Sequence, residues 1–163
     1  MEKLLRNIYE DKVKQKICLA ASAVSAWCAA LFFGLQLFWH LILGEYITLA
    51  VVSASAAIGF ILVTVLRKII NAKRPYEIYD FYTVPPRAKL GASHPSRHCY
   101  SAAVIATLGW LVSPLVTLAV GILTLIIAVT RVVTGIHFVR DTAAGIALGV
   151  LFGGIGILVN FLI

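Results

Sequence analysis

The sequence predicts an all-α membrane protein, a polytopic transmembrane helical bundle of about five spans, with six as the alternative. Of its 163 residues, 61% are hydrophobic and only 13% are charged, so the chain is too apolar for an ordinary soluble domain. A helix needs about 20 apolar residues to cross the hydrocarbon core of a bilayer. The stretches that approach or exceed this length without Asp, Glu, Lys or Arg are 17–44, 46–66, 98–130 and 142–163.

The boundaries of the spans follow from these stretches. The third stretch is long enough to fold back on itself, and Ser113-Pro114 interrupts it. Because proline lacks a backbone donor and disfavours helix at the residue before it, we expect a tight turn there. We treat residues 1–163 as one membrane-embedded domain, whose residues 1–16 form either a short interfacial helix or a solvated tail. The expected spans are 17–43, 46–66, 95–112, 115–131 and 141–162.

Basic residues gather on one face of the expected bundle. Because each span reverses the direction of the chain, all fourteen Lys and Arg residues fall on or at the edge of the face that carries the N-terminus. The opposite face keeps one acid, Glu45, and has Trp39 and Trp110 near it, where indole rings favour the headgroup zone. The positive-inside rule would place the basic face in the cytoplasm, in a bacterial plasma membrane. A site for anions would gather the same cations, which is the alternative explanation.

The net charge of +7 does not indicate a nucleic-acid partner. The positive charges are interleaved with membrane spans and lie at their mouths, so they form no continuous basic surface.

Three polar clusters interrupt the apolar chain, and the expected spans bring all three to the basic face. They are residues 67–75, 94–98 and 130–141. Interfacial anchoring would explain any single Lys or Arg among them, but not two histidines and an aspartate placed among arginines. Arginine presents a planar fork of donors that suits the oxygens of phosphate. A phosphate site is therefore the sharper interpretation.

His137 and Asp141 are four residues apart, so a helical stretch would place them on one face. The carboxylate could then accept a hydrogen bond from one ring nitrogen, which fixes the tautomer and leaves the other nitrogen free to attack phosphorus. His98, from a different cluster, could protonate the departing alkoxide. Asp141 could instead serve as a helix N-cap, a role that does not exclude the first.

The three clusters resemble the signature of the type 2 phosphatidic acid phosphatase family, which reads K-x6-R-P, P-S-G-H and S-R-x5-H-x3-D. In this chain, over about residues 67–150, the corresponding residues are Arg67-x6-Arg74-Pro75, Pro95-Ser96-Arg97-His98 and Thr130-Arg131-x5-His137-x3-Asp141. Arg67 replaces the lysine, and Lys68 beside it could take over that role. Arg97 replaces the glycine, which either crowds the site or adds a cation. Thr130 replaces the serine and keeps a hydroxyl.

The resemblance implies a helical bundle that hydrolyses a lipid phosphate or diphosphate monoester through a phosphohistidine intermediate, without a metal or other cofactor. It implies that His137 is the nucleophile, that Asp141 orients it, and that His98 is the acid for the leaving group and then the base for water. The active-site loop region would be 67–97. The phosphate-binding residues would be Arg67, Lys68, Arg74, Ser96, Arg97 and Arg131.

Phosphatidate, phosphatidylglycerophosphate and a polyprenyl phosphate or diphosphate are the expected substrate classes. Two other functions stay open at this point. One is a lipid phosphotransferase, in which an alcohol replaces water as the acceptor. The other is a non-catalytic lipid-binding or transport protein, which would not explain why two histidines and an aspartate occur together. Family members commonly have three spans before the first motif, whereas this chain has room for two.

Other residues have expected structural roles. Gly145, Gly149 and Gly153 recur every four residues along the last span, which favours close helix packing inside the bundle over a dimer interface. His40 is expected to be an interfacial residue near the opposite face. Aromatic residues after the first motif form either a lid over the site or an ordinary membrane-boundary belt: Tyr76, Tyr79, Phe81 and Tyr82.

Overall fold

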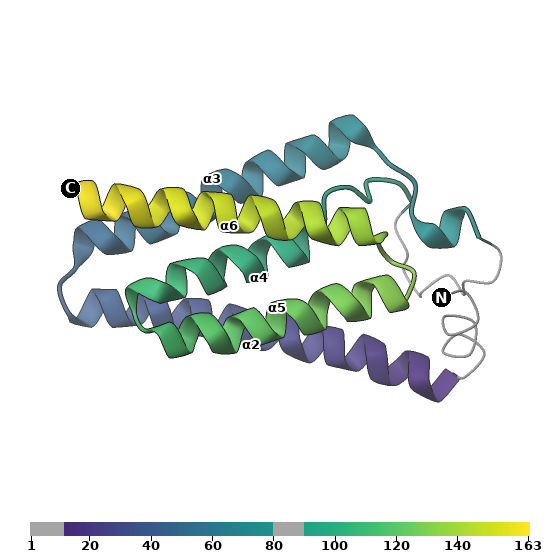
Figure 1. Ribbon diagram of the computed structural model, residues 1–163, viewed down its shortest axis with the longest axis horizontal. Helices are drawn as coiled ribbons and strands as arrows, with labels where there is room; N and C mark the ends of the chain where they lie inside the picture. Colours follow the sequence, from purple (N-terminus) through teal and green to yellow (C-terminus); the bar gives the residue numbers. More distant parts are fainter. Residues whose placement is uncertain (1–11, 80–89) are drawn as a thin grey trace.

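A computed structural model gives the structure of residues 12–79 and 90–163. In these two ranges the chain folds into five α-helices, packed lengthwise as a bundle, and has no β-strand (Figure 1). The predicted all-α bundle is therefore confirmed. The helices are α2 (Lys12–Ile42), α3 (Tyr46–Ile70), α4 (Arg97–Leu108), α5 (Pro114–Val133) and α6 (Val139–Leu162), with 3-10 turns η1 (Pro75–Glu77) and η2 (Gly109–Leu111).

The ends of the helices lie close to the predicted boundaries. Ser113 accepts a hydrogen bond from Leu115 N at 3.1 Å, and Pro114 begins α5, so the predicted turn is confirmed. The first helix begins at Lys12 and not at residue 17, which removes residues 12–16 from the predicted surface segment. The prediction of an interfacial helix falls on residues 1–11, which lie outside the described residues.

Four of the described helices, α2, α3, α5 and α6, are long and apolar enough to cross a membrane. The third predicted span is different, because α4 has only 12 residues before it tightens into η2. A 12-residue α-helix is about 18 Å long, well short of the roughly 30 Å hydrocarbon core. The predicted five-helix order is right, but the third helix is too short to meet the length criterion for a span.

The short helix α4 lies between the other helices (Figure 1). Eight of its twelve residues are buried. Tyr100 Oη donates to Ala56 O of α3 at 3.0 Å. Gln36 Nε2 of α2 donates to Leu108 O at 2.7 Å, which satisfies a carbonyl at the end of α4 that has no partner within the helix. Helix α4 is thus held by protein neighbours along its length.

Small residues let α6 approach α4 closely, as the glycine spacing predicted. A Cβ added at Gly145 would collide with Ser96 O, one at Gly149 with Ala103, and one at Gly153 with Thr107. Because glycine has no side chain, the backbone of α6 can lie in contact with α4 along this stripe. The packing interpretation of this stripe is confirmed, and its consequence is that the start of α6 is fixed against the start of α4.

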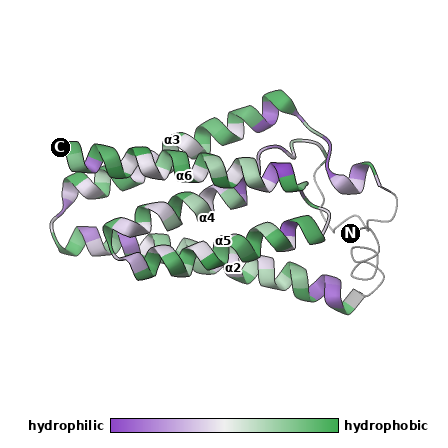
Figure 2. Ribbon diagram, in the orientation of Figure 1, coloured by the Kyte–Doolittle hydropathy of each residue, from purple (hydrophilic) through white to green (hydrophobic). Residues whose placement is uncertain are grey.

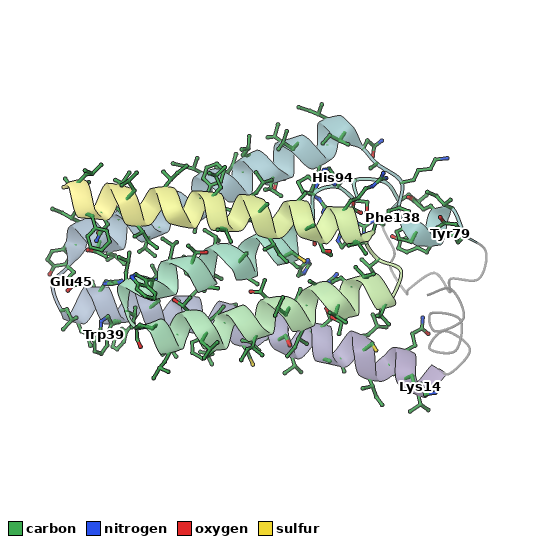
Figure 3. All side chains as sticks on the ribbon, viewed as in Figure 1. Lys14, Trp39, Glu45, Tyr79, His94 and Phe138 are labelled. Atoms are coloured by element: carbon green, nitrogen blue, oxygen red, sulfur yellow. The ribbon has the colours of Figure 1, made fainter. Side chains whose placement is uncertain are left out.

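The two ends of the bundle differ in polarity. Hydrophilic residues are concentrated at the end that carries the starts of α2 and α6, while the sides of the bundle are apolar (Figure 2). Trp39 and Glu45 lie at the opposite end from His94, Phe138 and Tyr79 (Figure 3).

His40 lies beside Glu45, at the end of the bundle where it was expected. Its side chain is buried, and its Nδ1 lies 2.7 Å from Glu45 Oε2. Pairing with this carboxylate offsets the cost of burying the ring.

Candidate active site

The ends of four helices meet at the polar end of the bundle. Arg67 is in the last turn of α3, His98 in the first turn of α4, Arg131 in the last turn of α5, and Asp141 in the first turn of α6. Ser96 N donates to Asp141 O at 2.9 Å, which joins the start of α4 to α6. His98 lies within electrostatic range of His137, Arg131, Arg97 and Arg67. The structure therefore brings the three polar clusters to one site.

His137 lies in the short connection between α5 and α6. The chain turns at Gly135, whose φ of +63° is a left-handed conformation that favours glycine. Ile136 N and His137 N both donate to Arg131 O at 3.1 Å, so the connection folds back over the end of α5. The His137 side chain is 3% exposed. These contacts fix the position of the ring in the site.

Burial also sets the charge of the His137 ring. The pKa of His137 is lowered to about 4, mainly because burial disfavours the charged imidazolium. Arg74 and Arg67 act in the same direction, and Asp141 opposes them. The ring is therefore neutral near pH 7 and carries a free lone pair.

Asp141 is fully buried and faces His137 from the next turn of chain. His137 Nδ1 is 3.7 Å from Asp141 Oδ2, which exceeds hydrogen-bond distance. The same Oδ2 accepts a hydrogen bond from Phe138 N at 3.0 Å, so the carboxylate also caps the first turn of α6. The predicted direct hydrogen bond to His137 is therefore absent, although the two side chains are close. Asp141 is also not the N-cap itself: it is the third residue of α6 and bonds back to the N-cap residue, Phe138.

Two residues that the sequence analysis did not assign to the site contact this carboxylate. Ser93 Oγ donates to Asp141 Oδ2 and lies 3.2 Å from His137 Nδ1. His94 Nδ1 lies 3.1 Å from Asp141 Oδ1. The sequence did contain a signal for both residues: they directly precede Pro95, so the chain that brings the second motif to the site brings them there as well.

Arg67 and Arg74 use part of their donor capacity on the backbone. Arg67 Nη1 donates to Pro95 O at 2.7 Å and to Ser93 O at 3.3 Å. Arg74 Nε donates to Gly91 O at 3.1 Å. These bonds hold the segment that precedes α4 in place. Both arginines therefore position the backbone of the site in addition to supplying positive charge.

One donor in the site has no partner within the described ranges. Arg131 Nε is buried and makes no hydrogen bond there, whereas the buried Ser96 hydroxyl lies beside the Cys99 thiol. A buried donor without an acceptor costs free energy, and a bound anion would satisfy Arg131 Nε. The guanidinium of Arg97 lies over the Phe60 ring, 5.9 Å from its centre. Lys68 is exposed on the outer side of α3, apart from this group.

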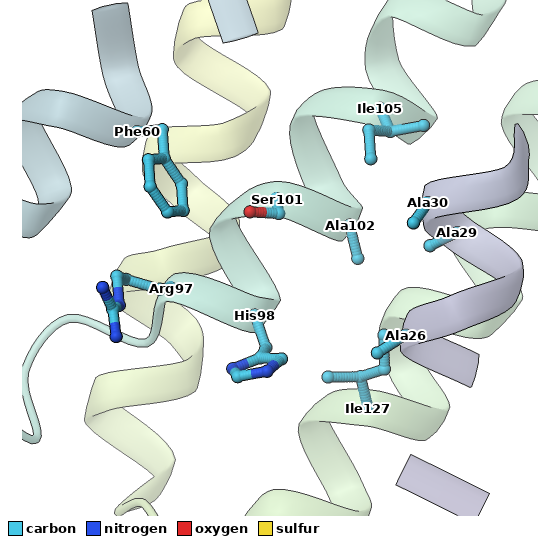
Figure 4. Close-up of a pocket in the computed structure, with 10 residues that line it drawn as sticks. All are labelled: Ala26, Ala29, Ala30, Phe60, Arg97, His98, Ser101, Ala102, Ile105 and Ile127. Carbon is cyan, nitrogen blue, oxygen red and sulfur yellow. The ribbon is translucent and has the colours of Figure 1, made fainter. Parts of the chain in front are cut away.

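An apolar pocket of about 300 Å³ opens directly beside His98. Figure 4 shows Phe60 of α3 and the alanines of α2 on opposite sides of the start of α4, with Arg97 and His98 at one end. A second pocket of about 320 Å³ shares Phe60, Ser101 and Ile105 with it. The charged groups of the site and an apolar cavity therefore lie next to each other at the start of α4.

No group of three or more His, Cys, Asp or Glu side chains gathers as a metal site within residues 12–79 and 90–163. The donors that gather at the site are instead guanidinium, hydroxyl and imidazole groups, which suit an anion.

Two solved structures have similar folds. The crystal structure of Aquifex aeolicus LpxE has a TM-score of 0.70 and 17% sequence identity, over 96% of this chain and 93% of that chain. The crystal structure of a transmembrane PAP2-type phosphatidylglycerolphosphate phosphatase from Bacillus subtilis has a TM-score of 0.52 and 19% identity, over 98% of this chain and 92% of that chain. At such identities the similarity shows the fold. No curated protein sequence matches the chain.

The family comparison covers most of the helices described above. The model of the PAP2 superfamily matches residues 48–162, from the start of α3 to the end of α6. This range includes His98, His137, Asp141 and the arginines of the site. The chain therefore belongs to the PAP2 superfamily and is an integral membrane phosphatase.

Proposed function

We propose that this protein hydrolyses a lipid phosphate or diphosphate monoester through a phosphohistidine intermediate formed on His137. The observation that carries the proposal is the unsatisfied buried donor Arg131 Nε, at a site that also holds His98 and His137. A phosphoryl group would accept a hydrogen bond from this donor. Arg67, Arg74 and Arg97 would add the positive charge that the transition state needs.

In the first step, the Nε2 lone pair of neutral His137 attacks phosphorus. The bond from phosphorus to the ester oxygen breaks, and His98 gives its proton to that oxygen as it leaves. Burial and the neighbouring cationic groups lower the pKa of His98 to about 3, so the negative charge of the bound phosphate must raise this pKa for the ring to carry the proton. For a diphosphate, the leaving group is the lipid monophosphate. The guanidinium groups stabilise the negative charge on the transferred phosphoryl oxygens.

In the second step, His98 is neutral and accepts a proton from water. The water oxygen attacks phosphorus, the bond between phosphorus and Nε2 breaks, and inorganic phosphate leaves. His137 and His98 return to their starting states. Both steps require that His137 and His98 lie on opposite sides of the bound phosphoryl group.

The apolar pocket supports a lipid as the substrate. Its walls are alanine, phenylalanine and isoleucine side chains, and it begins at His98. A hydrocarbon chain attached to the phosphate would lie there, because each buried methylene contributes about 0.8 kcal/mol. Phosphatidate, phosphatidylglycerophosphate and polyprenyl phosphates or diphosphates all have this form. We propose that the site faces the cytoplasm, on the strength of the positive-inside rule.

Phosphate release from a panel of lipid monophosphates and diphosphates tests the function directly. Purified protein in detergent should release inorganic phosphate from at least one of them, and a chelator should leave the rate unchanged. Adding candidate alcohol acceptors distinguishes hydrolysis from phosphotransfer, because a phosphotransferase would form a new phosphate ester. Binding of the lipids without release of phosphate would contradict the proposal.

Blocking the pocket should change chain-length preference. Ala30 lines the pocket but is not in the packed core, so Ala30→Phe should fill the cavity without unfolding the protein. Losing room for three or four methylenes costs roughly 2–3 kcal/mol. We therefore expect kcat/KM to fall roughly 30- to 150-fold for long-chain substrates and to stay near normal for a short-chain ester.

Ala20→Phe is the matched control. Ala20 is exposed on the same helix, one heptad before the exposed Trp27, so it faces away from the pocket. It should leave both substrates unaffected. An equal loss for long and short chains in Ala30→Phe would contradict the assignment of the pocket to a hydrocarbon chain.

The protonation of His137 should follow its lowered pKa. The folded value of about 4 lies below the ordinary value near 6.5, so the ring should remain neutral from pH 7 down to about pH 5. It should take up a proton only as the pH falls through about 4. NMR of protein labelled with ¹⁵N-histidine measures this without substrate, and His137→Ala identifies the signal. Protonation near pH 6.5 would contradict the burial argument.

A further inference from the structure

The Ser93 hydroxyl lies between the nucleophile and its carboxylate. Its Oγ contacts Asp141 Oδ2 as a donor and lies 3.2 Å from His137 Nδ1. The direct separation of Nδ1 and Oδ2 is 3.7 Å, too long for a hydrogen bond. The contact between the two residues therefore passes through a third side chain that belongs to none of the three motifs.

The protons of this arrangement can be assigned by counting donors and acceptors. The ionised carboxylate only accepts, so the single Ser93 hydroxyl proton points to Oδ2. The Oγ lone pairs are then free to accept, and the neighbouring His137 Nδ1 must carry a proton to complete the contact. In neutral imidazole the other nitrogen is then unprotonated. Ser93 thus selects the tautomer in which Nε2 can attack phosphorus.

The carboxylate is fixed for this task by contacts on both oxygens. Phe138 N donates to Oδ2 at 3.0 Å, and His94 Nδ1 lies 3.1 Å from Oδ1. The Ser93 backbone is held independently of its hydroxyl, because Ser93 N donates to Ala72 O at 2.9 Å and Arg67 Nη1 donates to Ser93 O. Removing the hydroxyl alone should leave the surrounding structure in place.

We propose that Ser93 is a positioning residue that connects Asp141 to His137 and fixes the tautomer of the nucleophile. The proposal rests on the phosphohistidine mechanism above for its effect on the rate. Its effect on the ring does not depend on that mechanism, because the tautomer exists in the resting protein.

Ser93→Ala should lower kcat roughly 10- to 100-fold, the scale seen when the outer hydrogen-bond partners of metal-binding histidines are removed. KM should change little, since Ser93 lies behind the nucleophile and not on the phosphate side. Ser93→Thr keeps the hydroxyl and should restore most of kcat. NMR of the ¹⁵N-labelled ring should show the Nδ1–H tautomer in the wild type and in the Thr variant, and a mixture of tautomers in the Ala variant.

Ser53→Ala is the matched control. It removes the same hydroxyl group from the first half of α3, where Ser53 Oγ donates to Leu49 O at 2.8 Å, away from the polar end of the bundle. The His137 tautomer should stay unchanged in this variant.

The two readouts separate the possible failures. A wild-type tautomer in Ser93→Ala would overturn the proposal, and so would equal losses of kcat in the Ala and Thr variants. If the wild type releases no phosphate from any lipid but the tautomer shifts only in Ser93→Ala, the proposed function fails and the positioning role stands.

Discussion

Replacing His137 with alanine is expected to lower kcat by roughly 10⁴- to 10⁶-fold, the range seen when a nucleophile or its partner is removed from other enzymes. The reason is that no other described side chain in the site can take its place. His98 lies at the start of α4 and has the opposite role in the mechanism, while His94 contacts the carboxylate behind the nucleophile. Phosphate release from the best lipid substrate measures the loss.

His40→Ala makes the same chemical change at the opposite end of the bundle and should retain activity. Elution of each variant as a single species in detergent checks that it has folded. Rapid quenching with ³²P-labelled substrate should trap acid-labile, protein-bound phosphate in the wild type and none in His137→Ala. Substantial turnover by His137→Ala would exclude this residue as the nucleophile.

Replacing His98 with alanine should have the next largest effect, and the loss should depend on the leaving group. General acid-base catalysis contributes about 10²- to 10⁴-fold, so hydrolysis of a lipid phosphate should fall by that factor. A nitrophenyl phosphate releases a stable anion that needs no proton. With this substrate, the first step should survive in His98→Ala.

The second step still needs a base for water, so the phosphorylated form of His98→Ala should accumulate. The measurement is a burst of nitrophenol close to one equivalent per protein, followed by slow turnover. In the wild type the turnover should be continuous. If the burst rate falls as much as the lipid rate does, His98 does not act as the acid, and its effect must come from binding.

The sequence predicted the long helices well because their signal is local. Charge-free runs mark α2, α3, α5 and α6, and Ser113-Pro114 marks the turn before α5. The length of α4 carried no such signal. The apolar run that begins at His98 continues through both α4 and α5, so composition does not reveal that the first of these helices stops at Leu108.

The site was predictable where its chemistry depends on residue type and spacing, and less so where it depends on contacts across the chain. The spacing of His137 and Asp141 placed them together, but their separation of 3.7 Å depends on how the connection folds over α5. Ser93 is 48 positions from Asp141, and nothing local in the sequence pairs them. The hydrogen bonds from Arg67 to backbone carbonyls could not be predicted for the same reason, because the presence of an arginine does not indicate which acceptor its guanidinium contacts.

The burial of α4 has a consequence for how the enzyme is made. A helix with little surface toward lipid gains little from the bilayer alone, and this one is also too short to span the membrane by itself. We expect it to enter as half of a hairpin with α5 and to become buried when α2, α3 and α6 pack around it. The active site would then be completed last during biogenesis, when the glycine-lined face of α6 packs against α4 and Asp141 reaches its position beside His137.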